Sequence, residues 1–87
     1  MIHESHKRVV NRLKRAEGHL RTIIRMIEQE KPCVEVAQQL HAVEKAVAQA
    51  KKAFIRDHID HCLDGAVERH EDTKALVCEF KEMSKYL

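Results

Sequence analysis

Apolar side chains recur along this 87-residue chain in alternating steps of four and three residues. In the first third they are Val9, Leu13, Ala16, Leu20, Ile23 and Ile27. In the middle they are Val36, Leu40, Val43, Val47, Ala50 and Phe54, and near the C-terminus Leu76, Phe80, Met83 and Leu87. This period places each series on one face of an α-helix, so the pattern predicts an all-α protein with three helices.

Local signals set the expected ends of the first helix. It should start near Glu4 or Ser5, either of which suits a helix N-terminus, and run to about Gln29. Gly18 lies inside it and costs about 1 kcal/mol relative to Ala. A close helix crossing at Gly18 is the expected compensation, because glycine lets two backbones approach.

The second helix should begin near Pro32, the single proline of the chain. Pro32 disfavours helical geometry at the residue before it and suits the first turn of a new helix. Cys33 is therefore expected at or near a helix N-terminus. The helix is expected to run a turn past Leu63 before Asp64, Gly65 and the polar stretch of residues 68–73 break it. A short third helix over residues 72–86 completes a protomer with two long antiparallel helices.

The chain is expected to form a single domain over residues 1–87, and a small one. A core of this size stabilises a lone chain only weakly, so apolar faces this long favour burial between subunits. The N-terminal stretch contains no long apolar run, so neither a signal peptide nor a membrane span is expected. The protein is expected to be cytoplasmic. The sequence contains no Gly-rich phosphate loop, nucleophile elbow or HExxH motif, so an enzyme is not expected.

Positive charge gathers in the first third of the chain. Residues 1–31 hold eight Lys or Arg against four acids, whereas residues 32–63 hold four against four and residues 64–87 four against six. One basic stripe consists of Arg8, Arg12 and Arg15, and a second of Lys7, Lys14, Arg21 and Arg25. The excess suggests an anionic partner such as DNA, although a solvated helix face would have the same composition.

One pair of residues has the spacing of a metal site. His58 and Cys62 are four residues apart, so they share a helix face and can bind one metal ion together. Cys33 lies twenty-five residues earlier, or roughly 37 Å along a continuous helix. If Cys33 belongs to the same site, a second subunit must supply it.

The other histidines and the third cysteine have weaker patterns. His61 points about 100° away from Cys62, and His3 and His6 lie near the N-terminus, so these three are additional candidate ligands. Isolated helical histidines usually have an ordinary hydrogen-bond partner, and this interpretation is applied to His19, His41 and His70. Cys78 is interpreted as a buried or half-buried structural cysteine.

The run NRLKRAEGHLRTIIRMIEQEKPCVEVAQQLHAVEKAV, followed by DHIDHCLDGAV, resembles the copper-sensitive operon repressor family over roughly residues 5–85. Cys33, His58 and Cys62 match the ligand positions of its copper branch. The resemblance implies a disc-shaped dimer of dimers that binds double-stranded operator DNA when apo and releases it on metal binding. It also implies that one subunit supplies the first cysteine and its neighbour the histidine and second cysteine.

The resemblance extends to residues around the site and to the DNA contacts. Glu79 is the nearest match to a third-helix glutamate that contacts the ligand histidine in copper-type members. Arg12 matches a functional arginine of the family. Position and charge add further expected DNA contacts: Lys14, Arg15, Lys51 and Lys52.

Departures from the copper pattern keep alternatives open. Pro32 stands where copper-type members often have tyrosine, and His3 resembles the N-terminal histidine of the nickel/cobalt branch with a shifted register. Cu(I) is therefore the first expectation and Ni(II) or Co(II) the second. A thiol-based sensor in which Cys33 and Cys62 react is the third. A structural helical oligomer without a ligand is the remaining alternative.

Overall fold

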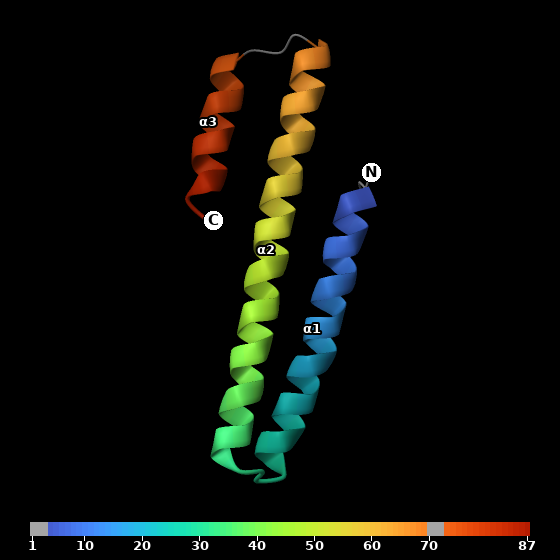
Figure 1. Cartoon of the computed structure of the whole chain (residues 1–87), viewed down its shortest axis with the longest axis vertical. Helices are drawn as coiled ribbons and strands as arrows, with labels where there is room; N and C mark the ends of the chain where they lie inside the picture. The colour runs from blue at the N-terminus through green and yellow to red at the C-terminus, as the bar shows by residue number, and fades with distance from the viewer. Residues whose placement is uncertain (1–3, 70–72) are drawn as a thin grey trace. The chain divides into compact units, whose positions relative to one another are not determined.

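The computed structural model describes the backbone of residues 4–69 and 73–87, and the side chains of residues 6–60 and 74–87. It contains α1 (Glu4–Glu28), α2 (Cys33–Arg69) and α3 (Thr73–Ser84) (Figure 1). These residues form no strand, which confirms the all-α class for the described part of the chain. None of the described helices combines the length and the apolar character needed to cross a membrane.

The chain divides into two compact units, Met1–Ala50 and Lys51–Leu87, and α2 runs through both. The expectation of a single domain therefore stays a prediction. In the first unit, α1 and the beginning of α2 form an antiparallel hairpin (Figure 1). In the second unit, α3 contacts the later part of α2.

The hairpin turn has the hydrogen bonds of a Schellman motif. The N–H of Lys31 donates to the carbonyl of Met26 at 2.9 Å, and the N–H of Glu30 donates to the carbonyl of Ile27 at 3.0 Å. Glu30 has a φ of 56°, the left-handed conformation that this motif requires. The carbonyl of Pro32 then accepts from the N–H of Val36 at 3.2 Å, and α2 begins.

Replacing Glu30 by glycine is expected to stabilise the protein by about 0.5–1 kcal/mol. Glycine removes the Cβ strain of the left-handed conformation, and part of this gain is offset by greater freedom in the unfolded chain. Denaturant unfolding measures the change. Glu28→Gly is the matched control, because Glu28 is helical and the same replacement there should cost about 1 kcal/mol. A Glu30→Gly variant no more stable than the wild type would contradict this account of the turn.

The predicted apolar faces of α1 and α2 each separate into two series with a spacing of seven residues. Val9, Ala16 and Ile23 in α1 and Val36, Val43 and Ala50 in α2 are at most 9% exposed. Leu13, Leu20 and Ile27 in α1 and Leu40, Val47 and Phe54 in α2 are at least 40% exposed. We call the second set the exposed apolar series. Half of the predicted apolar face of α1 and of α2 is thus left open in the single chain.

The core of the first unit joins the buried series of the two helices. Ala16 and Ile23 from α1 pack with Val36 and Val43 from α2, and Met26 packs against this cluster. The antiparallel course of the hairpin brings these residues together, because each helix turns its buried series towards the other. The contacts leave the remaining sides of both helices available to other molecules.

The two glycines have little effect on the described helices. α2 continues through Gly65, because a single glycine costs only about 1 kcal/mol, and it ends at Arg69 within the polar stretch that was expected to break it. A Cβ built on Gly18 meets no atom within 4 Å, so no described part of the chain crosses closely there. The structure of the single chain therefore gives no packing reason for Gly18.

Candidate metal and DNA sites

Cys33 is the first residue of α2 and has a free, exposed thiol. It borders an open hollow of about 410 Å³ at the hairpin end, which Ile27 and Leu40 also line. Both belong to the exposed apolar series. A molecule that covered this series in the first unit would therefore lie close to the Cys33 thiol.

His58 is held by contacts from two sides in the second unit. Its Nε2 lies 2.7 Å from Oε1 of Glu79, so the imidazole N–H donates to the carboxylate of α3. The ring of Phe54 stacks on it with a centroid separation of 6.5 Å and an angle of 16° between planes. The contact between Glu79 and His58 that the resemblance implied is present, and a metal ion would then coordinate the other ring nitrogen, Nδ1.

The remaining candidate ligands are only partly described. Cys62 and His61 lie in α2, but their side chains are outside the described residues, as are His3 and His70. His6 is half-buried in α1. Among the described side chains, no three His, Cys, Asp or Glu residues converge as a metal site. The ligand set Cys33, His58 and Cys62 therefore stays a prediction.

A single chain cannot bring Cys33 to His58. Both residues belong to α2, which is helical throughout, and twenty-five helical residues rise roughly 37 Å. Each nevertheless borders the exposed apolar series, Cys33 beside Leu40 and His58 beside Phe54. A shared site is thus possible only if surfaces of two copies meet.

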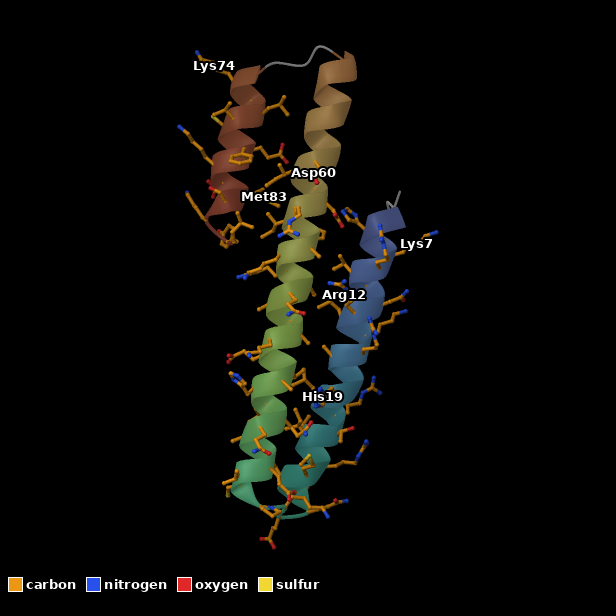
Figure 2. All side chains as sticks on the ribbon, viewed as in Figure 1. Lys7, Arg12, His19, Asp60, Lys74 and Met83 are labelled. Atoms are coloured by element: carbon orange, nitrogen blue, oxygen red, sulfur yellow. The ribbon has the colours of Figure 1, made fainter. Side chains whose placement is uncertain are left out.

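The predicted DNA contacts all have exposed side chains, but they do not share one face. Arg12 and Arg15 line one hollow between α1 and α2, where Figure 2 shows Arg12 on the side of α1 that borders α2. Lys14 follows Arg12 by two residues and points about 200° away around the helix. Lys51 and Lys52 are exposed on α2 in the second unit. The structure therefore groups Arg12 with Arg15 and separates Lys14 from them.

The interpretation of Cys78 as a buried structural cysteine was wrong. Its thiol is free and exposed on α3. Cys78 lies two residues from both Leu76 and Phe80, so it points to the opposite side of the helix from that apolar face. The apolar pattern of α3 already contained this information.

The profile of the family described as metal-sensitive transcriptional repressor matches residues 5–86. This chain belongs to that family. The family consists of transcriptional repressors and not of enzymes, and its function implies DNA binding.

Individual relatives include sensors of two metals. The copper-sensing repressor CsoR of Bacillus subtilis is 34% identical over 89 residues, which cover 95% of this chain and 88% of that protein. CsoR of Mycobacterium ulcerans is 43% identical over 58 residues, covering 67% of this chain and 50% of that protein. The chain thus spans about half the length of the mycobacterial relatives that it matches. The nickel-responsive regulator InrS has a similar structure, with a TM-score of 0.82, 32% identity, and coverage of 100% of this chain and 98% of that one.

The structure also reveals polar residues that the sequence patterns did not single out. Nε2 of His19 lies 2.6 Å from Oε1 of Gln39, which confirms a hydrogen-bond partner for this isolated histidine. His19 and Gln49 also line the hollow that contains Arg12 and Arg15. No sequence motif marks this group, because its members come together only when the two helices pair in the observed register.

Proposed function

We propose that this chain is a Cu(I)-responsive repressor, which binds operator DNA without metal and releases it when Cys33, His58 and Cys62 bind Cu(I). Two thiolates and one imidazole provide the soft donor set that Cu(I) prefers, and Cu(I) accepts three ligands. The copper-sensing relatives support this choice of metal. The structural observation that carries it is the hydrogen bond between His58 and Glu79.

That hydrogen bond prepares His58 to act as a ligand. A carboxylate that accepts from one imidazole nitrogen fixes the tautomer and orients the other nitrogen towards a metal ion. Phe54 restricts the same ring from its face. Because Glu79 belongs to α3, the bond also connects the ligand to a second helix. A change in the position of His58 is therefore transmitted to α3.

The site requires a second copy of the chain. One copy supplies Cys33 and its partner supplies His58 and Cys62, since a continuous α2 keeps these groups apart within one chain. The exposed apolar series supports a homodimer, because it offers each copy an apolar surface next to Cys33. The proposed working form is a dimer of dimers, as the family resemblance implies.

Arg12 and Arg15 are the proposed principal DNA contacts. Both guanidinium groups are exposed, and guanidinium matches the geometry of phosphate oxygens. Lys14, Lys51 and Lys52 are further candidates from other faces of the helices. Such contacts bind mainly through phosphates, so DNA affinity should fall steeply as the salt concentration rises.

A nickel- or cobalt-responsive repressor is the second candidate function. The observation that favours it is the similarity to nickel-responsive InrS over the full length of this chain. Ni(II) would take an additional nitrogen ligand to complete a square-planar arrangement. His3, His6 and His61 are the available candidates for that ligand.

Replacing His3 and His6 by alanine distinguishes the two metals. A Cu(I) sensor should keep its metal affinity and still release its promoter DNA, because the three core ligands are unchanged. A Ni(II) or Co(II) sensor that uses either histidine should lose metal-dependent release. Fluorescence anisotropy of a labelled promoter duplex, titrated with the apo, Cu(I)-loaded and Ni(II)-loaded protein under anaerobic conditions, measures the response.

His41→Ala is the matched control, because His41 is an exposed histidine of α2 outside the proposed ligand set. It should respond to metal like the wild type. If wild-type apo protein binds the promoter and Ni(II), rather than Cu(I), releases it, the copper proposal is wrong. If neither metal releases it and an electrophile does, the thiol-based alternative replaces both.

A further inference from the structure

A basic hollow lies between α1 and the first part of α2, within the first unit. Its volume is about 330 Å³, and it is lined by Arg12, Arg15, Ala16, His19, Ala46 and Gln49. Counted from Arg12, the other three residues of α1 follow after three, four and seven positions, which places all four on one face of the helix. The two alanines contribute only methyl groups to the lining, which leaves room between the longer polar side chains.

The charges of this hollow are all positive. None of its lining residues in the described part of the chain is Asp or Glu. Arg12 and Arg15 make no ion pair or side-chain hydrogen bond within the described residues. On another face of α1, by contrast, Arg21 pairs with Glu17 at 3.1 Å. The hollow therefore offers two uncompensated guanidinium groups to an anion.

Further hydrogen-bonding groups complete the rim. The hydrogen bond of 2.6 Å to Gln39 ties the imidazole of His19 to α2 and limits its rotation. Figure 2 shows His19 on the side of α1 that borders α2, like Arg12. The amide of Gln49 supplies N–H donors from the opposite helix. Because Nε2–H of His19 donates to Gln39, only the protonated ring, which a nearby anion favours, has a second N–H at Nδ1 to donate. With His19 protonated, donors from two helices converge on one opening, as binding of a tetrahedral oxyanion requires.

We propose that this hollow binds one backbone phosphate of double-stranded operator DNA. Arg12 and Arg15 supply the charge, while the amide of Gln49 and Nδ1–H of the protonated His19 ring supply further hydrogen bonds. Gln39 positions that ring by accepting from Nε2–H. This inference rests on the proposed function as a DNA-binding repressor and adds His19, Gln39 and Gln49 to its DNA interface. The same chemistry would also accept free inorganic phosphate, so the experiment must separate the two sources.

The first measurement is promoter affinity of the apo protein at several salt concentrations. Arg15→Gln should lower the slope of log affinity against log salt by about 0.9, the value for one lost phosphate contact. His19→Ala and Gln49→Leu should each weaken binding by about three- to tenfold, the usual effect of losing one hydrogen bond to a charged group. Arg21→Gln and His41→Ala are matched controls and should bind like the wild type.

Gln39→Leu separates a DNA contact from a structural role. It removes the hydrogen bond between the helices but keeps the imidazole, so it should weaken DNA binding less than His19→Ala does. Equal losses in both variants, accompanied by equal losses in thermal stability, would mean that His19 only joins the helices. Circular dichroism confirms that each variant is folded before its DNA affinity is compared.

Promoter duplexes with single neutral methylphosphonate linkages then identify the phosphate. One linkage should weaken binding of the wild type but cause little further loss in Arg15→Gln, because that contact is already absent. Wild-type promoter binding with unchanged affinity in Arg15→Gln, His19→Ala and Gln49→Leu would overturn the phosphate site and the choice of Arg15 as a DNA contact. It would leave metal-responsive repression itself intact.

Titration with inorganic phosphate covers the remaining outcome. If the wild type does not bind its promoter, the proposed function fails, and NMR shifts of His19 and Gln49 on adding phosphate decide whether the hollow binds anions at all. Shifts without any effect of the variants on DNA binding would assign the hollow to free phosphate. No shifts and no effect on DNA binding would exclude both sources.

Discussion

A mixture of two defective variants, Cys33→Ala and His58→Ala, is expected to recover metal-dependent DNA release that neither variant shows alone. In a two-fold symmetric dimer, each site takes Cys33 from one subunit and the other two ligands from its partner. A mixed dimer then has one intact site, in which the His58→Ala subunit supplies Cys33. Random pairing restores about a quarter of all sites.

Each parent variant should fail for a different reason. Cys33→Ala loses a thiolate ligand and should weaken Cu(I) binding by at least about 100-fold, the upper range seen for changes around metal ligands. His58→Ala keeps both thiolates and should still bind Cu(I), but it lacks the imidazole that contacts Glu79. It should therefore bind metal without releasing DNA.

The measurement uses subunits with different tags, refolded together, and follows Cu(I) retained against a chelator and promoter release by anisotropy. Cys78→Ala is the matched control, because Cys78 is also an exposed free cysteine, and it should behave like the wild type. A mixture no more responsive than its parents would show that the site is not shared between subunits. A normal response of His58→Ala alone would replace metal sensing with cysteine modification.

The helices could be predicted from sequence because their signals are local. Pro32 and the four–three spacing located the start of α2 at Cys33. α2 ends at Arg69, within the polar stretch of residues 68–73, and passes through Gly65 because a cost of about 1 kcal/mol is small for a helix of this length. The contact between His58 and Glu79 could be expected from the family resemblance alone, because residues on different helices have no spacing that predicts contact.

Two features could not be predicted because they depend on how α1 and α2 pair. The sequence showed a single apolar face on each helix, and only the hairpin decides that Val43 is buried and Val47 exposed. The partnership of His19 with Gln39 likewise depends on the register that the turn at Glu30 imposes. A single histidine forms no repeating sequence pattern, so only the positions of α1 and α2 in the structure could identify its partner.

Replacing Leu20 and Val47 by glutamate is expected to separate the assembly into poorly folded single chains. Both residues belong to the exposed apolar series, one on each helix of the hairpin. If a second copy covers this surface, each variant side chain becomes an unpaired charge in an apolar interface. Two such charges per two-fold interface, at roughly 3 kcal/mol each, raise the dissociation constant by about 10⁴-fold for either substitution alone.

Light scattering coupled to size-exclusion chromatography should show a dimer or tetramer for the wild type at micromolar concentration and a monomer for the double variant. Helical content should fall as well, because a monomer of 87 residues has little core to stabilise it. Val34→Glu is the matched control: Val34 is 70% exposed but lies about 160° around α2 from Val36, away from the apolar face. It should leave the assembly intact. A folded wild-type monomer, or a double variant of unchanged size, would contradict the proposal that a second copy covers this surface. Either result would also contradict a ligand set in which Cys33 comes from a second subunit.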